Sequence, residues 1–313
     1  MILSVTLNPA VDHQIFVDHL KLHDTNRVVR TEIDAGGKGT NLSRVFAELG
    51  GKTVATGFLG GNAAAVVRRV LEIQGVESSF IDVSGETRTN VSVEDASGNP
   101  PTTYNAKGPL ISESEYAELL SHVDQLSKGA AWICMGGSLP PGCSVSSFHE
   151  IGTVAKKNGC KVLLDADGDA CLEGMKCGPD FIKPNSKEAA RLLGRPIDVT
   201  QEAIQGARDL LAMLPNPEAI VVISRGEQGA VLATAGGTFL GQTAKVEARS
   251  TIGSGDSFLG GMLWALESGE DIATSFRWGL AAGAATATTD GTAIARKLVT
   301  QVLFEHCAVE HVG

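Results

Sequence analysis

The chain has 313 residues, 43% of them hydrophobic and 20% charged, which is the composition of an ordinary globular protein. Its formal net charge of −10 argues against a general nucleic-acid or anionic-membrane surface, because such surfaces depend on clustered lysine and arginine. We therefore expect no nucleic-acid and no membrane partner, and an anionic ligand would need a local positive pocket.

Short apolar runs along the chain predict strands that are buried on both faces, because most of them are apolar throughout instead of alternating. Amphipathic patterns between them predict helices. The predicted strands are 2–7, 53–58, 131–135, 161–165, 181–183 and 219–224, and the predicted helices are 40–49, 63–74, 112–126, 147–158, 186–193 and 200–214. This alternation predicts an α/β fold with a mainly parallel sheet and helices on both faces.

Two stretches, 12–34 and 88–107, depart from this rhythm because they alternate polar and apolar residues and contain turn residues, such as those at 97–101. We interpret them as strands of a small second sheet, inserted at two points into a single domain of residues 1–313 and able to act as a lid. Near the end of the chain, a glycine loop at 253–256 enters a predicted helix, and a second helix is predicted over 272–289.

The segment TIGSGDSFLGG sets Gly253, Ser254, Gly255 and Asp256 at the mouth of that helix. Backbone N–H groups are unpaired there and the helix dipole is positive, so the loop can bind a phosphate group. Asp256 would be placed to accept a proton from an incoming hydroxyl. A purely structural role is equally open, because aspartate is a favoured N-cap and glycine favours turns.

A second glycine-rich turn, AGGKGTN at 35–41, also enters a helix and could bind an anion or a polyol, or serve as a tight loop. The chain has no GxxxxGKS/T pattern, which excludes a P-loop NTPase. A third segment, GGSLPPG at 136–142, follows a buried-looking strand, and open α/β sheets bind ligands at that end. A simple turn explains it equally well.

In KPNSKE at 183–188, Asn185 and Glu188 stand three apart at a helix start, where they form either a capping box or an oxygen set for water-bridged Mg²⁺. The segment VVISRGEQGAVL from Val221 predicts strand, turn and strand. It could lie along a nucleotide base or be a plain connection. None of the seven histidines falls in these segments, which argues against a histidine metal site.

The six cysteines include no CxxC pair, so we expect buried reduced thiols instead of a zinc or redox site. The first apolar run lacks a basic leader and ends at Asn8-Pro9, which is short for a signal peptide. The stretch GLAAGAATATT from Gly279 is about half a membrane span. We expect a soluble, cytoplasmic protein.

The order of these segments resembles the phosphofructokinase B branch of the ribokinase superfamily of carbohydrate kinases, which includes 1-phosphofructokinase and tagatose-6-phosphate kinase. The match covers nearly the whole chain and comprises TLNPAVD (6–12), AGGKGTN (35–41), TRTNV (87–91), GGSLPPG (136–142), KPNSKE (183–188), VISRGEQGA (222–230) and TIGSGDSF (251–258). The resemblance implies a ribokinase-like domain with a β-sheet lid that also forms a homodimer contact. It also implies ATP, with Mg²⁺, as the phosphoryl donor.

The resemblance also implies roles for individual residues. It makes Asp256 the catalytic base and the backbone of Gly253, Ser254 and Gly255 an anion hole. It implies sugar-phosphate contacts from Asp12, Arg27, Gly37, Lys38, Asn41, Arg88, Asn90 and Ser138. It implies a nucleotide side formed by Lys183, Asn185, Ser224, Gly226 and Gly229, with Asn185 and Glu188 organising Mg²⁺.

Lys38 in the first glycine loop and the TRTNV run look most like 1-phosphofructokinase. They imply fructose 1-phosphate as acceptor and fructose 1,6-bisphosphate as product, with fructose 6-phosphate and tagatose 6-phosphate as alternatives. Gly136, Asp167 and Arg225 depart from the usual pattern of the branch, and Arg225 puts the detail of nucleotide binding in question. A non-catalytic sugar-phosphate or nucleotide sensor, and a ribose or nucleoside kinase, stay open as rival functions.

Overall fold

The computed structural model describes residues 1–96 and 101–313. The predicted turn at 97–101 therefore lies outside the described residues, apart from Pro101. Within the described part of the chain, no helix is both long enough and apolar enough to cross a membrane.

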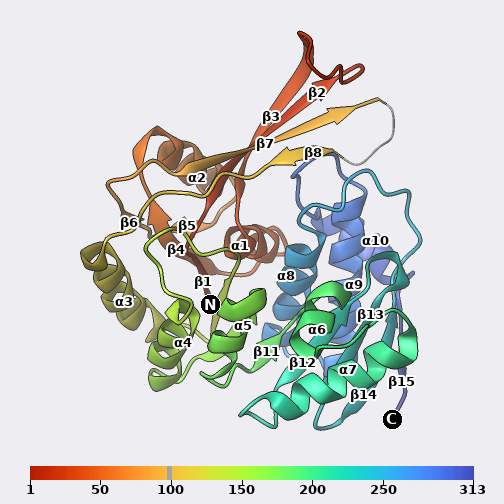
Figure 1. Cartoon of the computed structure of the whole chain (residues 1–313). Coiled ribbons are helices and arrows are strands. Elements are labelled where there is room, and N and C mark those ends of the chain that lie inside the picture. The colour runs from red at the N-terminus through yellow and green to blue at the C-terminus, as the bar shows by residue number, and fades with distance from the viewer. Residues whose placement is uncertain (97–100) are drawn as a thin grey trace.

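A large sheet runs through the centre of the molecule (Figure 1). Its strands are ordered β15 (Ala308–His311), β14 (Gly237–Gln242), β13 (Ala230–Thr234), β12 (Ile220–Ser224), β11 (Phe181–Ile182), β10 (Lys161–Asp165), β9 (Trp132–Gly136), β1 (Ile2–Thr6), β4 (Thr53–Leu59) and β5 (Glu77–Ser78), with β6 (Ile81–Asp82) also paired to β4. The strands from β5 to β12 pair in parallel, and β12 to β15 pair antiparallel. The mainly parallel sheet is confirmed, and its antiparallel edge beyond β13 is an addition.

Helices cover both faces of this sheet. One face carries α3 (Glu113–Ser127), α4 (Ser147–Lys157), α5 (Gly168–Met175), α6 (Ser186–Leu193) and α7 (Thr200–Met213). The other carries α1 (Lys38–Glu48), α2 (Gly61–Ile73), α8 (Ser254–Glu267), α9 (Ile272–Ala287) and α10 (Lys297–Phe304). In β1, Ile2 packs into the core on the α1 and α8 side, and Leu3 and Val5 pack into the other core. The side chains of this strand alternate between two cores, so all five of its residues are buried, including Ser4 and Thr6.

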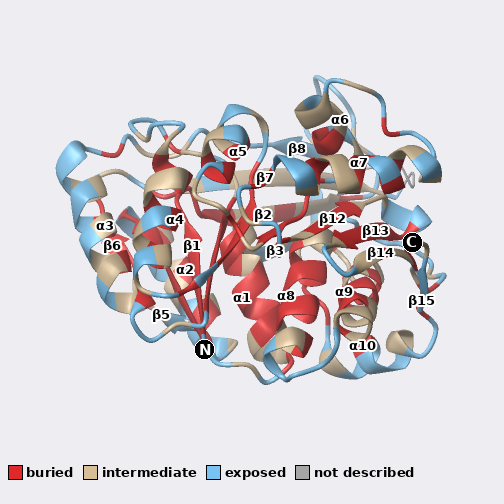
Figure 2. Ribbon diagram, turned by 90° about the horizontal axis from the view of Figure 1, so that it is seen from below, coloured by how far each residue is buried: buried red, intermediate tan, exposed pale blue. Residues whose placement is uncertain are grey.

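Helices α1 and α8 lie side by side in the buried centre of their layer (Figure 2). Gly260 allows this close approach, because a Cβ at that position would lie 2.8 Å from Cβ of Val45. One turn earlier on each helix, Asn41 contacts Asp256. The two helices therefore start beside each other, which brings two glycine-rich loops from opposite ends of the chain to one place.

A small separate sheet projects from the large one and is ordered β3 (Val28–Gly36), β2 (Ala10–Val17), β7 (Arg88–Asp95) and β8 (Thr102–Tyr104) (Figure 1). This confirms the second sheet predicted from 12–34 and 88–107. Cross-strand register places Asp34, Asp12 and Asn90 in one row. The adjacent row, on the opposite face, is Ile33, His13, Val91 and Tyr104. One face of the small sheet is thus polar beside the glycine loops, and the other is largely apolar.

Candidate active site

Asp256 is buried in the first turn of α8, where it is the third residue of the helix. The N-cap is Gly253, whose φ of 75° lies in the left-handed region that favours glycine. The Oδ2 atom of Asp256 accepts a hydrogen bond of 2.9 Å from Nδ2 of Asn41. Aspartate as the N-cap, the structural alternative for this loop, is therefore wrong, and the carboxylate faces a residue of another helix.

The electrostatic setting of Asp256 suits a group that must accept a proton near neutral pH. Burial raises the pKa of its carboxyl to about 6, and the nearby charge of Asp165 acts in the same direction. The hydrogen bond from Asn41, together with the charges of Lys38 and Lys183, opposes this rise. A general base works best when its pKa lies near the working pH.

Two lysines meet at Asp165, the last residue of β10. Nζ of Lys38 lies 3.0 Å from Oδ1 of Asp165, and Nζ of Lys183 lies 3.7 Å from Oδ2. Burial alone would raise the pKa of Asp165, but the two ammonium groups hold it below its usual value. Asp165 is therefore an anion that keeps two cations beside the start of α8, where a Cβ on Gly255 would lie 3.2 Å from Nζ of Lys183.

Lys38, which was expected to contact the sugar phosphate, lies between Asp165 and Glu188. Its Nζ is 3.8 Å from Oε1 of Glu188, in addition to its contact with Asp165. Burial lowers the pKa of Lys38, but Asp165 and Glu188 outweigh this effect and hold the pKa above its ordinary value. The side chain thus connects Asp165 with the segment expected to organise the nucleotide.

The residues expected to bind the sugar phosphate gather at the root of the small sheet. Asn90 Nδ2 donates a 2.9 Å hydrogen bond to Oδ1 of Asp12. Arg88 donates to the backbone oxygen of Asn8 from Nε and Nη2, at 3.2 and 2.8 Å. Nδ2 of Asn8 donates in turn to Oγ of the exposed Ser138, at 3.1 Å. Nη1 of Arg88 donates to the backbone oxygen of Ala106 at 3.0 Å, and the N–H of Ala106 donates to Oδ1 of Asn90 at 3.3 Å, which joins these contacts into one connected cluster.

Backbone geometry at the first glycine loop brings this cluster to α1. Gly37 is the N-cap of α1 with a φ of 117°, and a Cβ there would lie 2.6 Å from Cγ2 of Thr6. A Cβ on Gly36 would lie 2.1 Å from Oδ2 of Asp12. Both glycines are required by close packing of the loop, whichever ligand it binds.

Arg27, another predicted sugar-phosphate contact, lies outside this cluster. It is exposed and immediately precedes β3, whose other end, at Asp34, pairs with Asp12. At about 3.3 Å per residue, the strand separates Arg27 from Asp34 by roughly 20 Å. The structure therefore does not bring Arg27 to the site within one chain, because an extended strand carries it to the far tip of the small sheet.

The nucleotide-side residues form a second group next to Lys183. Asn185 and Ser224 form a parallel bridge between the two loops. Gly226 is exposed, with open space where a Cβ would point. Gly229 is buried, and a Cβ there would lie 2.0 Å from the backbone oxygen of Gly241, so packing against β14 requires this glycine.

Asn185 and Glu188 form a capping box at the start of α6, which was the alternative to a magnesium site. Oδ1 of Asn185 accepts from the backbone N–H groups of Lys187 and Glu188, both at 3.0 Å. Oε2 of Glu188 accepts from the backbone N–H of Asn185 at 2.7 Å. The amide oxygen of Asn185 is therefore committed to the cap. Oε1 of Glu188 takes no part in the cap and faces Nζ of Lys38 at 3.8 Å, so a water-bridged Mg²⁺ at this oxygen would share it with the lysine. No cluster of three or more His, Cys, Asp or Glu side chains suited to a metal occurs within residues 1–96 and 101–313.

The three departures from the family pattern have structural explanations. A Cβ on Gly136 would lie 2.2 Å from the backbone oxygen of Asp165. Asp167 is the N-cap of α5 and pairs with Arg191. Arg225 donates to Thr200 Oγ1 at 2.8 Å and to Gln228 Oε1 at 2.6 Å. Asp167 and Arg225 are thus held by neighbouring elements.

Two site residues, Asp165 and Asn8, were not predicted. Asp165 could have been found, because it is a carboxylate at the carboxyl end of a buried strand, in the run KVLLD. Asn8 carries no such signal, since its role depends on contacts with Ser138 and with the backbone oxygen of Lys107, at 3.0 Å.

Comparison with known proteins agrees with this geometry. Residues 5–297 match the model of the pfkB family carbohydrate kinases. A curated 1-phosphofructokinase of Borreliella burgdorferi is 33% identical over 291 residues, which cover 92% of each chain. The crystal structure of phosphofructokinase-2 from Escherichia coli in complex with substrates and products is 26% identical, covers 97% of this chain and 98% of its own, and has a TM-score of 0.91.

A ribokinase of Arabidopsis thaliana complexed with ribose and ATP has a TM-score of 0.78, covers 97% of this chain and 98% of its own, and is 20% identical. This likeness shows the ribokinase-like fold. Because the family model spans nearly the whole chain and includes both glycine-rich loops, the protein belongs to the pfkB family of carbohydrate kinases and is an ATP-dependent sugar kinase.

Proposed function

We propose that this protein transfers the γ-phosphoryl group of ATP to a free primary hydroxyl of a ketohexose phosphate. The observation that carries the proposal is the position of buried Asp256, next to Lys38 and Lys183 on one side and linked through Asn41 to the loop that packs against Asp12 on the other. A phosphate on the acceptor would account for Arg88, a cation at the root of the small sheet.

In this proposal the acceptor hydroxyl donates its proton to the carboxylate of Asp256 as the hydroxyl oxygen attacks the γ-phosphorus. The bond between that phosphorus and the oxygen bridging it to the β-phosphate breaks, and ADP leaves. The backbone N–H groups of Gly253, Ser254 and Gly255 at the start of α8 stabilise the charge on the transferring group, for which the N–H of Ser254 exchanges its 3.3 Å hydrogen bond to the backbone oxygen of Thr251. Lys38 and Lys183 add positive charge next to that position. Phosphoryl transfer demands little covalent chemistry, so positioning and charge stabilisation supply most of the catalysis.

Mg²⁺, bound with ATP, would neutralise phosphate charge, and Glu188 would hold it through water at Oε1, the oxygen that also faces Nζ of Lys38 at 3.8 Å. Lys183, Ser224 and Gly226 would line the nucleotide on the same side, with Asn185 supporting the loop through its cap bonds. The small sheet would act as a lid that excludes water, which otherwise competes as an acceptor.

Fructose 1-phosphate is the acceptor we favour. The Borreliella burgdorferi relative is a 1-phosphofructokinase, and Lys38 stands in the first glycine loop as in that branch. A coupled ADP-release assay with fructose 1-phosphate, fructose 6-phosphate and tagatose 6-phosphate tests the preference. The highest kcat/KM is expected for fructose 1-phosphate. Turnover of ribose or a nucleoside in place of all three would refute a sugar-phosphate acceptor.

Replacing Arg88 by alanine is expected to raise KM for the sugar phosphate about ten- to a hundredfold, because a charge-assisted hydrogen bond is worth about 1.5–3 kcal/mol. KM for ATP is expected to stay within about threefold. Steady-state kinetics with each substrate varied in turn measures both. Arg68→Ala is the control, since Arg68 is a cation on α2 that pairs with exposed Asp82. An equal rise in both KM values would place Arg88 outside the acceptor site.

The proposal includes a homodimer formed through the small sheet. Its face opposite Asp12 carries Ile33 and Tyr104, which are 55% and 61% exposed, in one row with His13 and Val91. A largely apolar, exposed face of this kind is typical of an interface between copies of a chain.

Ile33→Asp is expected to convert the dimer to monomer, because it places a charge in the centre of an apolar interface. Sedimentation velocity over a range of concentrations measures the change. Leu298→Asp is the matched control, since Leu298 on α10 is also exposed, at 76%, but lies away from the small sheet. A dimer that persists in Ile33→Asp would move the interface elsewhere.

A further inference from the structure

Arg44 is a fully buried arginine that nothing above assigns to the reaction. It lies on α1, one turn after Asn41, and is 1% exposed. Nη1 donates to Oδ1 of Asn41 at 3.1 Å and to the backbone oxygen of Ala35 at 2.8 Å. Nε donates to Oε1 of Gln74 at 2.6 Å, and Nη2 pairs with Oδ2 of Asp34. The guanidinium thus connects three chain segments, the end of β3, the start of α1 and the C-cap of α2, with one rigid, planar group.

The bond to Asn41 fixes which way the asparagine amide faces. With Oδ1 accepting from Arg44, Nδ2 is left to donate to Asp256. A flipped amide would set its N–H groups against the guanidinium and its oxygen against the carboxylate, so both contacts would become repulsive. Arg44 therefore selects the amide orientation that gives Asp256 a hydrogen-bond donor.

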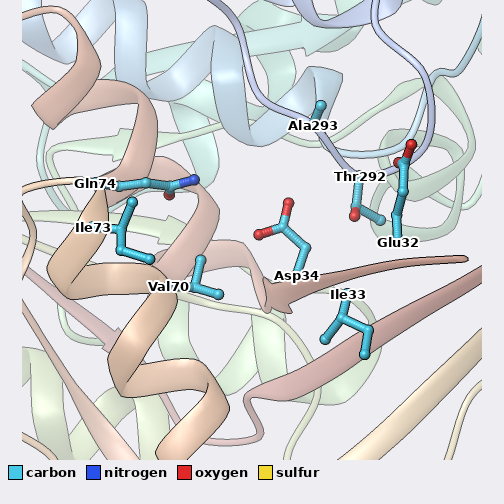
Figure 3. Close-up of a pocket in the computed structure, with 8 residues that line it drawn as sticks. All are labelled: Glu32, Ile33, Asp34, Val70, Ile73, Gln74, Thr292 and Ala293. Carbon is cyan, nitrogen blue, oxygen red and sulfur yellow. The ribbon is translucent and has the colours of Figure 1, made fainter.

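The other bonds of Arg44 reach the root of the small sheet. Asp34 and Ala35 are among the last residues of β3, and Gln74 follows α2 as its C-cap. Asp34 and Gln74 line an open pocket of about 350 Å³, and Figure 3 shows both side chains directed into it from the strand and the helix. The outer side of the Arg44 network thus borders a cavity where the root of the small sheet meets α2.

We propose that Arg44 is a positioning residue for phosphoryl transfer, which orients Asn41 toward Asp256 and ties that orientation to the root of the small sheet. The inference rests on the proposed role of Asp256 as base. A guanidinium is suited to this task because its planar fork serves several acceptors in fixed directions, which an ammonium group cannot reproduce.

Three other charges affect the pKa of Asp256. They are Lys38 on α1, Asp165 at the end of β10 and Lys183 after β11. Arg44→Lys keeps all three and keeps a positive charge at position 44. The substitution removes the planar guanidinium that fixes the orientation of the Asn41 amide. A change in the titration of Asp256 in this variant would therefore report the lost orientation of Asn41.

In Arg44→Lys, kcat is expected to fall about ten- to a hundredfold, as for the loss of a hydrogen bond to a charged group, with KM for the sugar phosphate within about threefold. The acid limb of the kcat–pH profile is expected to move up by about one pH unit, because a carboxylate that loses a donor holds its proton more tightly. A residue that only supports the fold would lower the melting temperature without moving this limb.

Two further variants distinguish a positioning role of Arg44 from a general loss of stability. Arg277→Lys is the matched control, since Nε of Arg277 is also tied to a backbone oxygen, that of Cys307, at 2.8 Å, and Arg277 lies in α9 on the far side of α8 from Asn41. It is expected to leave the acid limb in place. Asn41→Leu should move the limb as Arg44→Lys does, and the double variant should move it no further, because both changes remove one interaction.

A titration without substrate keeps this test independent of the proposed function. With ¹³C-labelled aspartate, the carboxyl signal of Asp256 is expected to titrate at higher pH in Arg44→Lys and in Asn41→Leu than in the wild type. An unchanged titration in either folded variant, or additive shifts in the double variant, overturns the proposal. Absence of kinase activity in the wild type, with the shifts present, would refute only the assigned reaction.

Discussion

Asp256→Asn is expected to lower kcat by about a hundred- to ten-thousand-fold, because asparagine cannot accept the proton that the acceptor hydroxyl must lose. The side chain keeps its size, so KM for both substrates is expected to change little. Steady-state ADP release with fructose 1-phosphate measures the effect. Asp271→Asn is the control, since Asp271 caps α9 by accepting from the backbone N–H of Thr274 at 2.9 Å. A fall in kcat of less than about tenfold in Asp256→Asn would remove Asp256 as the base.

The stability of the two variants should change in opposite directions at pH 8. Asp256 has a folded-state pKa of about 6 against an ordinary value of 3.8, so ionised Asp256 destabilises the folded protein above about pH 6, and this effect disappears below about pH 4. Asp256→Asn should therefore be more stable than the wild type at pH 8, by up to about 3 kcal/mol. Asp271→Asn should be less stable, by about 1 kcal/mol, because it weakens a helix cap. Urea unfolding at pH 8 measures both.

The same pKa predicts the pH profile of the wild type. Only the ionised carboxylate of Asp256 accepts a proton, so kcat is expected to fall about tenfold per pH unit below about pH 6. A rate that stays constant down to pH 4.5 would contradict this assignment.

Asp165→Ala is expected to reduce the free energy of unfolding at pH 7 by about 3–5 kcal/mol, because it leaves the ammonium groups of Lys38 and Lys183 without their shared anion. Urea unfolding measures the loss, and Asp165→Asn is the milder variant to use if alanine prevents folding. Asp167→Ala is the control two residues away, since exposed Asp167 only caps α5 and pairs with Arg191. It is expected to cost about 1 kcal/mol. Equal losses at both positions would contradict the central role of Asp165.

Removal of Asp165 should also change the pH dependence of both stability and kcat. Its folded-state pKa is depressed below 3.8, so its contribution to stability is complete above about pH 4 and is lost as the pH falls through the folded-state value. The stability gap between wild type and Asp165→Ala should therefore narrow in strong acid. The charge of Asp165 also raises the pKa of Asp256, so the acid limb of the kcat profile should move to lower pH in the variant. A limb that moves up would show that Lys38 or Lys183 has left the site.

The fold could be predicted largely from local sequence. The run KVLLD forms β10 and the amphipathic run from Ser186 forms α6, both with the predicted bounds. These predictions succeed because strand and helix periodicities depend on residues that are close together in the chain. The small sheet was predicted for the same reason, from its alternation. The antiparallel edge β14–β15 was missed, since its pairing joins Phe239 to His311, and such distant partners leave no local pattern.

The site, like the fold, could be predicted where it depends on local motifs and could not be predicted where it depends on distant contacts. The glycine loops and Asp256 were visible as motifs. That Gly253 is the N-cap, and that Asp256 faces Asn41, 215 positions away in the chain, became evident only in the folded structure. Arg27 was placed with the sugar-phosphate residues, and the length of β3 carries it away from them. Asn185 was expected beside magnesium, and the cap bonds of α6 occupy its oxygen.

The sequence by itself determined the α/β fold, the two glycine-rich loops and the candidate base, because helix, strand and turn preferences act between near neighbours in the chain. Only the tertiary structure decided that Asp165 holds two lysines and that Arg44 orients Asn41. Hydrogen bonds and ion pairs depend on distances of a few ångströms between atoms. Those distances are set when α1, α8 and β10 pack together, and no single segment of the sequence contains them.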